Sequence, residues 1–430
     1  MTKEPKDLQD VGSKPDGSSL WRHRDFMLLW SGQTVSEMGS AVTQIALPLV
    51  AVIALNASTF EVGLLAAAGT LAFALIALPA GAWVDGGSKR SIMIVCNILR
   101  LVIIGSIPVA AAFGVLTMAQ LYIVALAAGV CTVFFDVAYQ SYLPSLMSAE
   151  HLMGANGKLG TTQAFAQLGG PSLGGGLVGA FGAAGAMAVD ALSYVVSVLS
   201  IFGIRKREDP PKPRTDESLR RRIAEGLRFV IGHSVLRKVV ACTGVANLFS
   251  GMSWSLAMVF LVRELHVSPA LTGLVMAGGA VGGIAGGALA GRLAKKIGSA
   301  RIIWVSVLVF GAPQVVVAFA WPGWGVLLAP LGWAIAYFAG MVYNVAQLSY
   351  RQSVTPPELM GRMNAAVRWV VWGTMPLGGV LGGLLGTLIG VRPTLMLALI
   401  GSWAAGWFVF FSPFRHMRDI PESVPEPATP

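Results

Sequence analysis

Long apolar runs separated by short polar turns recur along the whole chain of 430 residues. A helix of ~20 apolar residues crosses a hydrocarbon core of ~30 Å, because it rises ~1.5 Å per residue. A soluble helical protein of this size would show amphipathic stripes instead. The pattern predicts an all-α polytopic membrane protein. Its twelve transmembrane helices are expected near residues 25–54, 61–84, 91–113, 118–140, 159–181, 184–204, 239–262, 270–293, 301–320, 325–346, 364–389 and 393–412.

Basic residues are distributed unevenly between alternate turns. With the N-terminus inside, only Arg263 and Arg392 of the 31 Lys and Arg residues fall in or beside outer loops, and Arg100 lies deeper in a span. This asymmetry predicts a protein of the cytoplasmic membrane with both termini cytoplasmic. It also explains the net charge of +10, helped by attraction to anionic membrane lipids. A nucleic-acid partner is therefore not expected.

An internal repeat divides the chain into two halves. A shift of 210 residues places STFEVGLLAAAG, which starts at Ser58, on SPALTGLVMAGG, which starts at Ser268. The same shift places GAWVDGGSKRSIMIV, which starts at Gly81, on GRLAKKIGSARIIWV, which starts at Gly291. Because six spans return the chain to the same side, the duplication predicts two parallel six-helix repeats.

The predicted organisation has five parts. The linker combines a Pro-rich start with a section of helical spacing from Asp216 to Ile231. This section is interpreted either as an amphipathic helix along the inner leaflet or as a solvated loop helix. The parts are an N-terminal tail at 1–24, a first half at 25–204, the linker at 205–238, a second half at 239–414 and a C-terminal tail at 415–430.

The turn GAWVDGGSKR between the second and third predicted spans resembles the signature loop of the major facilitator superfamily, roughly G-x-x-x-D-x-x-G-R-[RK]. Gly81 and Asp85 match, Ser88 replaces a glycine, and Lys89 and Arg90 supply the basic pair. With the two halves and the long central loop, this resemblance implies the major facilitator fold. It also implies that Asp85, Lys89 and Arg90 act in gating. A plain positive-inside turn is the alternative interpretation.

The fifth span carries a second motif, GKLGTTQAFAQLGGPSLGGG, which starts at Gly157. It resembles the pattern g-x8-G-x3-G-P-x2-G-G of drug/proton antiporters in this superfamily, with Ala166 in place of one glycine. Small residues let helices approach closely and proline bends a helix, although ordinary helix packing also uses both. The resemblance implies gating roles for Gly170, Pro171, Gly174 and Gly175.

Other stretches resemble the branch that contains macrolide efflux and siderophore export proteins. They are LWRHRDFMLLWSGQTVSEMGS, YLPSLMSAEHLMGAN and EGLRFVIGHSVLR. Together with the motifs, they carry the resemblance over almost the whole chain. It implies a large, partly apolar organic substrate, such as a drug, an antibiotic or a siderophore-like metabolite.

Ionisable residues at membrane depth are costly and are therefore functional candidates. Glu37 lies ~16 Å into the first span, and Gln33, Ser40 and Gln44 share its helical face. Burial disfavours the charged form of a carboxyl, which suits a proton carrier. Glu37 is therefore predicted to couple transport to protons, with Gln33 and Gln44 as substrate contacts. A carboxyl locked by hydrogen bonds is the alternative.

Arg100 and Asp136 are predicted to form a buried ion pair, since an unpaired buried charge costs several kcal/mol. Asp136 is also the second proton-coupling candidate. Asp190 and Arg368 are interpreted as structural, the latter as an anchor near the cytoplasmic side. Aromatic and amide side chains complete the expected substrate site, although most such residues in membrane proteins serve packing or interface belts. These are Gln163, Gln167, Asn247, Trp254, Tyr337 and Asn344.

Several motifs are missing from the sequence. It has no G-x-x-x-x-G-K-[ST] loop, no H-E-x-x-H and no His/Cys ligand cluster. A transporter is therefore expected rather than an enzyme, with no cofactor and no metal. We expect a secondary active exporter that works as a monomer, by alternating access and proton antiport. An importer or uniporter of a small metabolite, or a non-transporting membrane sensor, is the alternative.

The repeat predicts an asymmetric latch. Asp85 aligns with Lys295, so the second copy of the turn keeps positive charge but has no acid. An acid near a helix N-terminus is favourable by ~0.3–1 kcal/mol. Asp85→Asn is therefore expected to lower transport more than Lys295→Gln, measured as export from cells at matched protein levels. Equal or reversed effects would contradict the latch.

Overall fold

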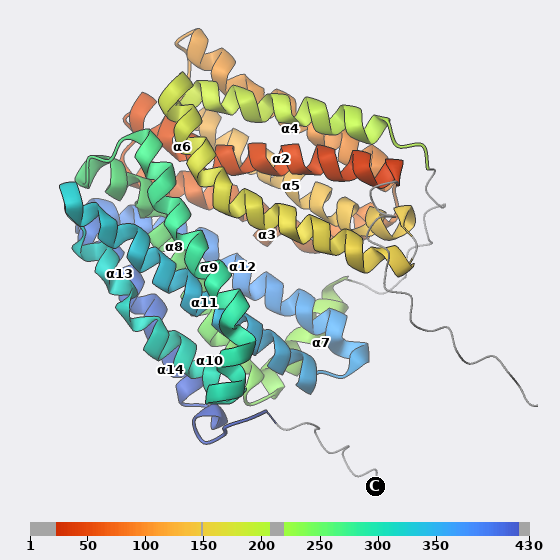
Figure 1. The fold of residues 1–430 in the computed structure, drawn as a ribbon, viewed down its shortest axis with the longest axis vertical. Coiled ribbons are helices and arrows are strands. Elements are labelled where there is room, and N and C mark those ends of the chain that lie inside the picture. Colours follow the sequence, from red (N-terminus) through yellow and green to blue (C-terminus); the bar gives the residue numbers. More distant parts are fainter. Residues whose placement is uncertain (1–22, 148, 207–218, 421–430) are drawn as a thin grey trace, which may run out of the picture.

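The computed structural model describes residues 23–147, 149–206 and 219–420. Its long helices alternate in direction through a bundle shown in Figure 1. The first group is α2 (Arg24–Leu49), α3 (Thr59–Asp85), α4 (Lys89–Ala112), α5 (Met118–Leu146) and α6 (Ala149–Phe202). The second group is α8 (Leu236–Val259), α9 (Pro269–Ile297), α10 (Arg301–Val305), α11 (Leu328–Val354), α12 (Pro357–Leu388), α13 (Val391–Ala404) and α14 (Gly406–Phe410).

The prediction of twelve spans is confirmed. Eleven helical segments in the described residues are long and apolar enough to cross a membrane. One of them, α6, contains two spans, because Gly182 at φ 73° breaks the helix where the chain turns back. The fifth span begins earlier than predicted, since α6 already starts at Ala149.

The ninth span is less regular than its apolar sequence predicts. After α10 it continues as a π-helical turn, Ser306–Phe310, and then as a 3-10 segment, Ala312–Phe319. Pro313 lies at the start of this last segment and has no backbone N–H to donate. This accounts for the change of helix type at that point.

The internal repeat is visible in the backbone. The first span ends in a π turn, Val50–Ala54, and the seventh ends in the same way at Phe260–Glu264. Each π turn is followed by a residue with positive φ, Asn56 at 49° and His266 at 53°. In each copy a serine side chain then caps the next helix. The two halves therefore share local geometry as well as sequence.

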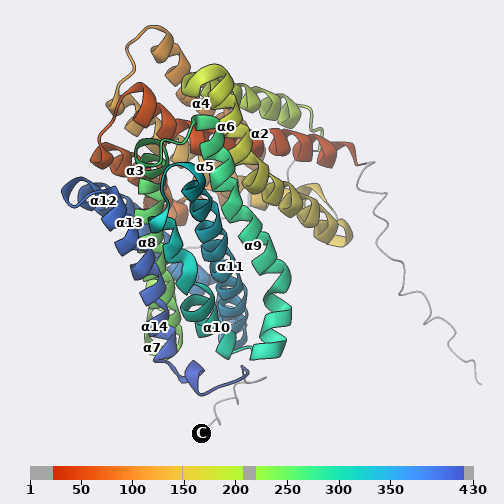
Figure 2. The same ribbon diagram turned by 60° about the vertical axis from the view of Figure 1, so that its left-hand side comes forward.

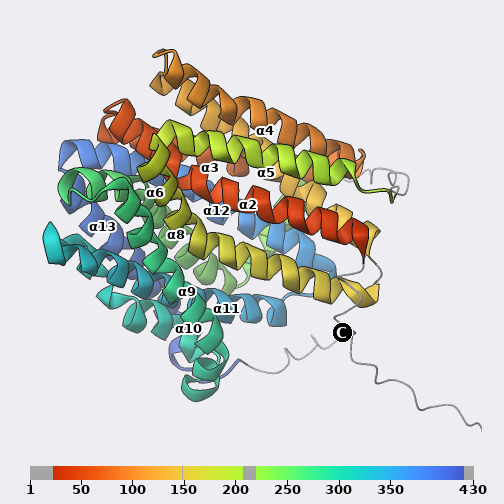
Figure 3. The same ribbon diagram turned by 45° about the horizontal axis from the view of Figure 1, so that its top comes forward.

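The helices pack into two groups. Within the first group α2 packs on α6, and α4 packs on both α5 and α6. Within the second group α9 packs on α11, and α8 packs on α12 and α13. The groups meet where α3 lies against α12 and where α6 lies against α9. Figures 2 and 3 show the groups running in different directions from this shared region.

Two names are used below for the membrane faces. The terminal face is the one at which α2 begins and α14 ends; the distal face is the opposite one, where α3 and α9 begin. In Figure 1 the two helix groups are close at the distal end and diverge toward the terminal end.

The linker helix α7 (Leu219–Gly232) packs on the terminal end of α12. Val230 is buried against Met363 and Val367, and Glu225 forms an ion pair with Arg362 of α12. A hydrogen bond from Arg221, with Arg362 also close, holds the pKa of Glu225 below its ordinary value. The ion pair is therefore present at neutral pH and is lost on acidification. The linker helix thus has a protein partner rather than only lipid or solvent.

Candidate functional site

The predicted polar face of α2 is engaged inside the first helix group. Gln33 is buried and donates a hydrogen bond of 2.8 Å from Nε2 to Oε1 of Glu37. One turn further along, the Ser40 hydroxyl lies 3.0 Å from that of Tyr194 in α6. Glu37 itself is half-buried and Gln44 is exposed. The α2 face therefore leads from the half-buried acid Glu37 toward the exposed amide Gln44.

Arg100 is the buried cation of this region. Its residue surface is only 4% exposed, and its guanidinium carbon lies 5.0 Å from the ring centre of Phe135 and 5.6 Å from that of Tyr194. Such cation–π contacts are worth ~0.5–2 kcal/mol. Arg100 acts electrostatically on three carboxyls, those of Glu37, Asp136 and Asp190. The single positive charge of Arg100 is thus shared electrostatically among three carboxyl groups.

The expected ion pair between Arg100 and Asp136 is not formed in this structure. Among the ion pairs of the described residues, none contains either side chain. The reason is that the guanidinium stacks on aromatic rings, which sequence spacing along two helices does not reveal. Asp136 also interacts electrostatically with Arg368, an exposed residue on α12 in the other helix group.

Some polar atoms around this cluster have no protein partner in the part of the chain that the structure describes. They include Oε1 of Gln33, Nε of Arg100 and the hydroxyl of Tyr139. Each is buried, so leaving it unpaired costs ~1–3 kcal/mol. Unpaired polar atoms beside three carboxyls suit a place where water, protons or substrate groups bind.

The eight predicted substrate-binding residues divide into two kinds. Gln33, Asn247 and Asn344 make hydrogen bonds: Asn247 donates to the carbonyl of Val371 at 3.1 Å, and Asn344 accepts from Gln347 at 3.0 Å. Asn247 therefore joins α8 to α12, and its role in substrate binding stays a prediction. The other five, Gln44, Gln163, Gln167, Trp254 and Tyr337, are exposed, as is Asn344.

A polar network in the second helix group was missed by the sequence analysis. Arg351 is buried and donates to Asn364 Oδ1 at 2.6 Å, while Gln347 lies between Arg351 and Asn344. The i, i+3, i+7 spacing of Asn344, Gln347 and Arg351 was the available signal. Asn364 joins them only because α11 and α12 form a hairpin.

Glycines form the contact between α3 and α12 near the distal face. A Cβ atom at Gly63 would lie 2.7 Å from the Gly379 carbonyl oxygen and 2.8 Å from the Gly383 nitrogen. Because these are backbone atoms, they have little freedom to move aside. Close to them, Arg263 donates to the carbonyl of Ala57 across the groups at 2.6 Å. The distal face is thus closed by direct contact between backbones.

The glycine motif of the fifth span faces two ways. Gly170 and Gly174 lie against α2 within their own helix group, at Ala41 and Val42. Gly175 lies against α9 instead: a Cβ there would be 2.8 Å from the Pro269 carbonyl oxygen. The carbonyl of Pro171 approaches α9 at Gly273. Close approach explains these small residues, and only part of the motif is placed between the groups.

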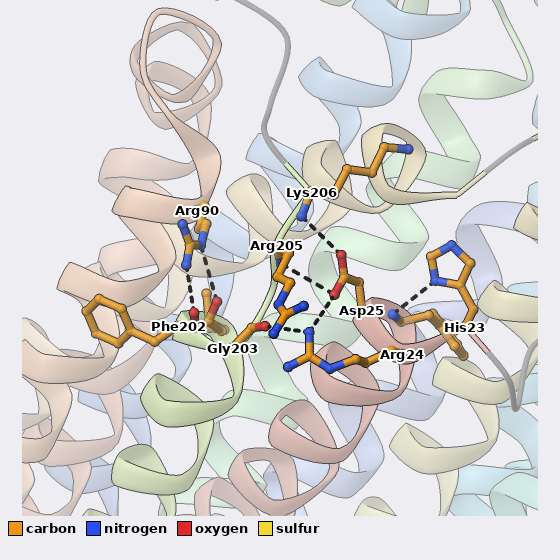
Figure 4. Close-up of polar contacts among 10 residues, drawn as sticks. His23, Arg24, Asp25, Arg90, Phe202, Gly203, Arg205 and Lys206 are labelled. Carbon is orange, nitrogen blue, oxygen red and sulfur yellow. Dashed lines mark hydrogen bonds and ion pairs between the residues drawn. The ribbon is translucent and has the colours of Figure 1, made fainter.

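The signature turn makes its described contacts inside the first helix group. Arg90 donates from Nε to the carbonyl of Ile201 at 3.2 Å and from a terminal nitrogen to that of Phe202 at 2.9 Å, as Figure 4 shows. A cation beside the last carbonyls of a helix is favourable. Lys89 begins α4, and the side chain of Asp85 lies outside the part that the structure describes. The gating role of all three stays a prediction.

The start of α2 also contacts the end of α6 and the residues that follow it. Arg24 donates to the carbonyl of Gly203 at 3.1 Å. Asp25 accepts from the backbone nitrogens of Arg205 and Lys206, at 3.4 and 3.0 Å (Figure 4). Together with Arg90, these contacts tie the first, third and sixth spans at the terminal face. We call this set the first clasp.

The second helix group has a corresponding clasp built from different residues. The segment after α14 runs across the turn between α9 and α10, where Asp419 accepts from the Ser299 backbone nitrogen at 2.9 Å. The Arg418 carbonyl accepts from Ala300 at 3.0 Å. The second copy of the turn has Lys295 where the first has the acid Asp85. Asp419, from the segment after α14, supplies an acid to this turn instead. It lies near the start of α10, where a negative charge is favourable.

An apolar groove of about 390 Å³ lies between α2 and α6. Exposed residues such as Val35, Leu173 and Leu192 line it, with Gly39 and Ser193 among the others. Its lining suits hydrocarbon rather than a charged ligand. Among the residues that the structure describes, no group of three His, Cys, Asp or Glu side chains gathers as a metal site.

Twelve spans in two parallel repeats, with a cluster of acids inside the first of them, define a transporter of the major facilitator fold. The sequence model of one family, described as transmembrane secretion effector, matches residues 18–428. The chain belongs to that family.

Relatives and solved structures agree with this assignment. The multidrug efflux pump Tap of Mycolicibacterium fortuitum is 26% identical over 89% of this chain and 94% of its own length. The enterobactin exporter EntS of Salmonella paratyphi A is 24% identical over 51% of this chain and 52% of its own. A bacterial homologue of the iron transporter ferroportin, in an inward-facing state, has a TM-score of 0.74 at 16% identity, covering 90% of this chain and 98% of its own. This last likeness concerns the fold alone.

Gly175 and Gly176 provide a matched pair for testing the distal contact. Gly175→Leu is expected to push α6 from α9, whereas a Cβ at Gly176 meets nothing within 4 Å. The measurement is the disulfide yield between cysteines placed at Gly179 and Ala270, which face each other across the contact, with the native cysteines replaced. We expect a several-fold lower yield with Gly175→Leu and an unchanged yield with Gly176→Leu. Equal yields would show that the contact is not as tight as described.

Proposed function

We propose that this protein exports a partly apolar organic compound from the cytoplasm in exchange for protons. The observation that carries the proposal is the set of three carboxyls around one buried cation in the first helix group. The names of the relatives, a multidrug efflux pump and an enterobactin exporter, support the direction of transport. A compound of drug, antibiotic or siderophore-like character is the proposed substrate.

The terminal face is assigned to the cytoplasm because nearly all basic residues lie toward it. The closed glycine contacts on the distal face then make this conformation one that receives substrate from inside. Alternating access would open those contacts and bring the terminal ends together. A substrate taken up in the present conformation is therefore released outside.

The proton-coupling role is assigned to Glu37 and Asp136. If all three carboxyls near Arg100 were ionised, the cluster would carry two net negative charges, because one cation faces three acids. Low-dielectric surroundings make that state costly, so protons or a bound substrate lower its free energy. Antiport requires that the two conformations differ in proton affinity, and Arg368 on α12 changes its distance to Asp136 when the halves move.

Substrate binding is assigned to the exposed polar and aromatic side chains of the predicted set. Gln44, Gln163 and Gln167 come from the first helix group, and Trp254, Tyr337 and Asn344 come from the second. Aromatic faces with a few amides suit a large, partly apolar compound. Importer, uniporter and non-transporting sensor all share this fold, and the relatives favour export over them.

Everted membrane vesicles provide the test. Cells with and without the protein are first screened for resistance to toxic organic compounds. A compound found in this way is then added to vesicles acidified inside, and we expect it to release part of the pH difference, measured with a fluorescent pH indicator. Glu37→Gln should lose at least ten-fold in this release, whereas Glu37→Asp, which keeps a titratable acid, should retain it partly.

Two results would contradict the proposal. If no resistance compound releases the pH difference, transport is not driven by protons. If Glu37→Gln gives wild-type release at equal protein levels, Glu37 is not the coupling residue.

A further inference from the structure

Asp190 is fully buried in α6, and no basic side chain among the residues that the structure describes forms an ion pair with it. Three hydroxyls surround its carboxylate: Thr43 donates to it from α2, Ser193 donates at 3.2 Å and Tyr194 at 3.4 Å. Gly39 of α2 leaves the space that this cluster fills, because a Cβ there would strike both Asp190 and Ser193. A buried acid held only by hydroxyl groups has partners in either protonation state, since a hydroxyl both donates and accepts.

The hydroxyls also connect Asp190 to the predicted proton site. The Tyr194 hydroxyl, which contacts Asp190, lies 3.0 Å from the Ser40 hydroxyl on α2. Ser40 follows Glu37 by three residues, so the two side chains are neighbours on one helix face, with Cβ atoms ~5–6 Å apart. The order Asp190, Tyr194, Ser40, Glu37 therefore runs from a buried acid to a half-buried one, with hydrogen bonds as far as Ser40 and a last step along one face of α2.

This path runs across part of the membrane. Asp190 lies eight residues after Gly182, ~12 Å from the distal end of its span. Glu37 lies seventeen residues before Ala54, ~25 Å from the distal end of its own. Asp190 is thus nearer the distal face, the side from which protons arrive in the proposed antiport.

The charged and titratable groups facing Asp190 come from three helices. From α4 comes Arg100, which acts on it electrostatically and lies over the Tyr194 ring. The second helix, α2, presents Thr43, and α6 itself presents Ser193 and Tyr194. Arg100 therefore favours the ionised form, and low-dielectric burial favours the protonated form.

We infer that Asp190 is a second proton site, which receives protons on the distal side and passes them to Glu37 through Tyr194 and Ser40. In each transfer the O–H bond of Asp190 breaks as Tyr194 accepts that proton and gives its own to Ser40. Ser40 in turn gives its proton to the Glu37 carboxylate, directly or through one water, so each hydroxyl keeps one proton. The inference rests on the proposed antiport and adds a delivery route to it.

The experiment uses the purified full chain in liposomes, with the proton as the only ligand. Infrared difference spectra between acid and alkaline buffer show the C=O band of each carboxyl that gains a proton. We expect one band to be lost in Asp190→Asn and a different band to be lost in Glu37→Gln. If Asp190→Asn removes no pH-dependent band, Asp190 is only a structural residue and the inference is wrong.

The variant Tyr194→Phe tests the transfer of protons from Asp190 to Glu37 separately from the protonation of Asp190 itself. The phenyl ring keeps the surface on which Arg100 lies but removes the hydroxyl between Asp190 and Ser40. We expect the Glu37 band to rise at least ten-fold more slowly after a rapid drop in pH on the distal side, with the same final amplitude. Tyr122→Phe is the control, because that hydroxyl, near the start of α5, donates to the Glu61 carbonyl of α3 and is not part of the path.

The outcomes separate this inference from the proposed function. Loss of coupled proton release in Glu37→Gln together with wild-type band kinetics in Tyr194→Phe would keep the antiport and reject the path. A slow Glu37 band in both Tyr194→Phe and Tyr122→Phe would also reject it, since the effect would then not be specific to the path.

Discussion

A buried guanidinium that forms no ion pair with any carboxylate of the described residues shapes the first half of this protein. Arg100 lies between the rings of Phe135 and Tyr194, so its charge is shared among three acids at longer range. A direct ion pair would neutralise one acid permanently. In the proposed coupling, this leaves each acid able to gain or lose a proton, and small movements of the helices would change which acid the charge of Arg100 stabilises. The proposed coupling depends on this arrangement.

The rest of the fold allows the halves to move as units. Each half has its own clasp at the terminal face, with Arg90 and Asp25 in the first and Asp419 in the second. Glycines make close backbone contacts between the halves near the distal face, where the Arg263 side chain also donates a hydrogen bond across the groups. Contacts of this kind separate without breaking many hydrogen bonds. Rigid halves and a smooth contact together suit a rocking motion.

Sequence periodicity was sufficient to predict the features that depend on a single helix. The twelve spans, the repeat and the shared face of Gln33 and Glu37 follow from spacing alone. Features that depend on how helices cross were not predictable in this way. The stacking of Arg100, the join of Arg351 to Asn364 and the supply of Asp419 to a distant turn all bring together residues far apart in the sequence.

The central claim is that protonation of the acids near Arg100 decides which face is open. Spin labels at Gly157 and Gly291 would report it, because both positions are exposed near the terminal ends of α6 and α9 and a Cβ there meets nothing within 4 Å. Protons must leave at the terminal face, so the terminal-open state must bind them more weakly. Pulsed electron–electron distance measurements should show a long distance at alkaline pH and a shorter one at acid pH, with most of this shift lost in Glu37→Gln/Asp136→Asn. The account would be contradicted if the distance between the labels did not change with pH. It would also be contradicted if the double variant kept the full change in distance.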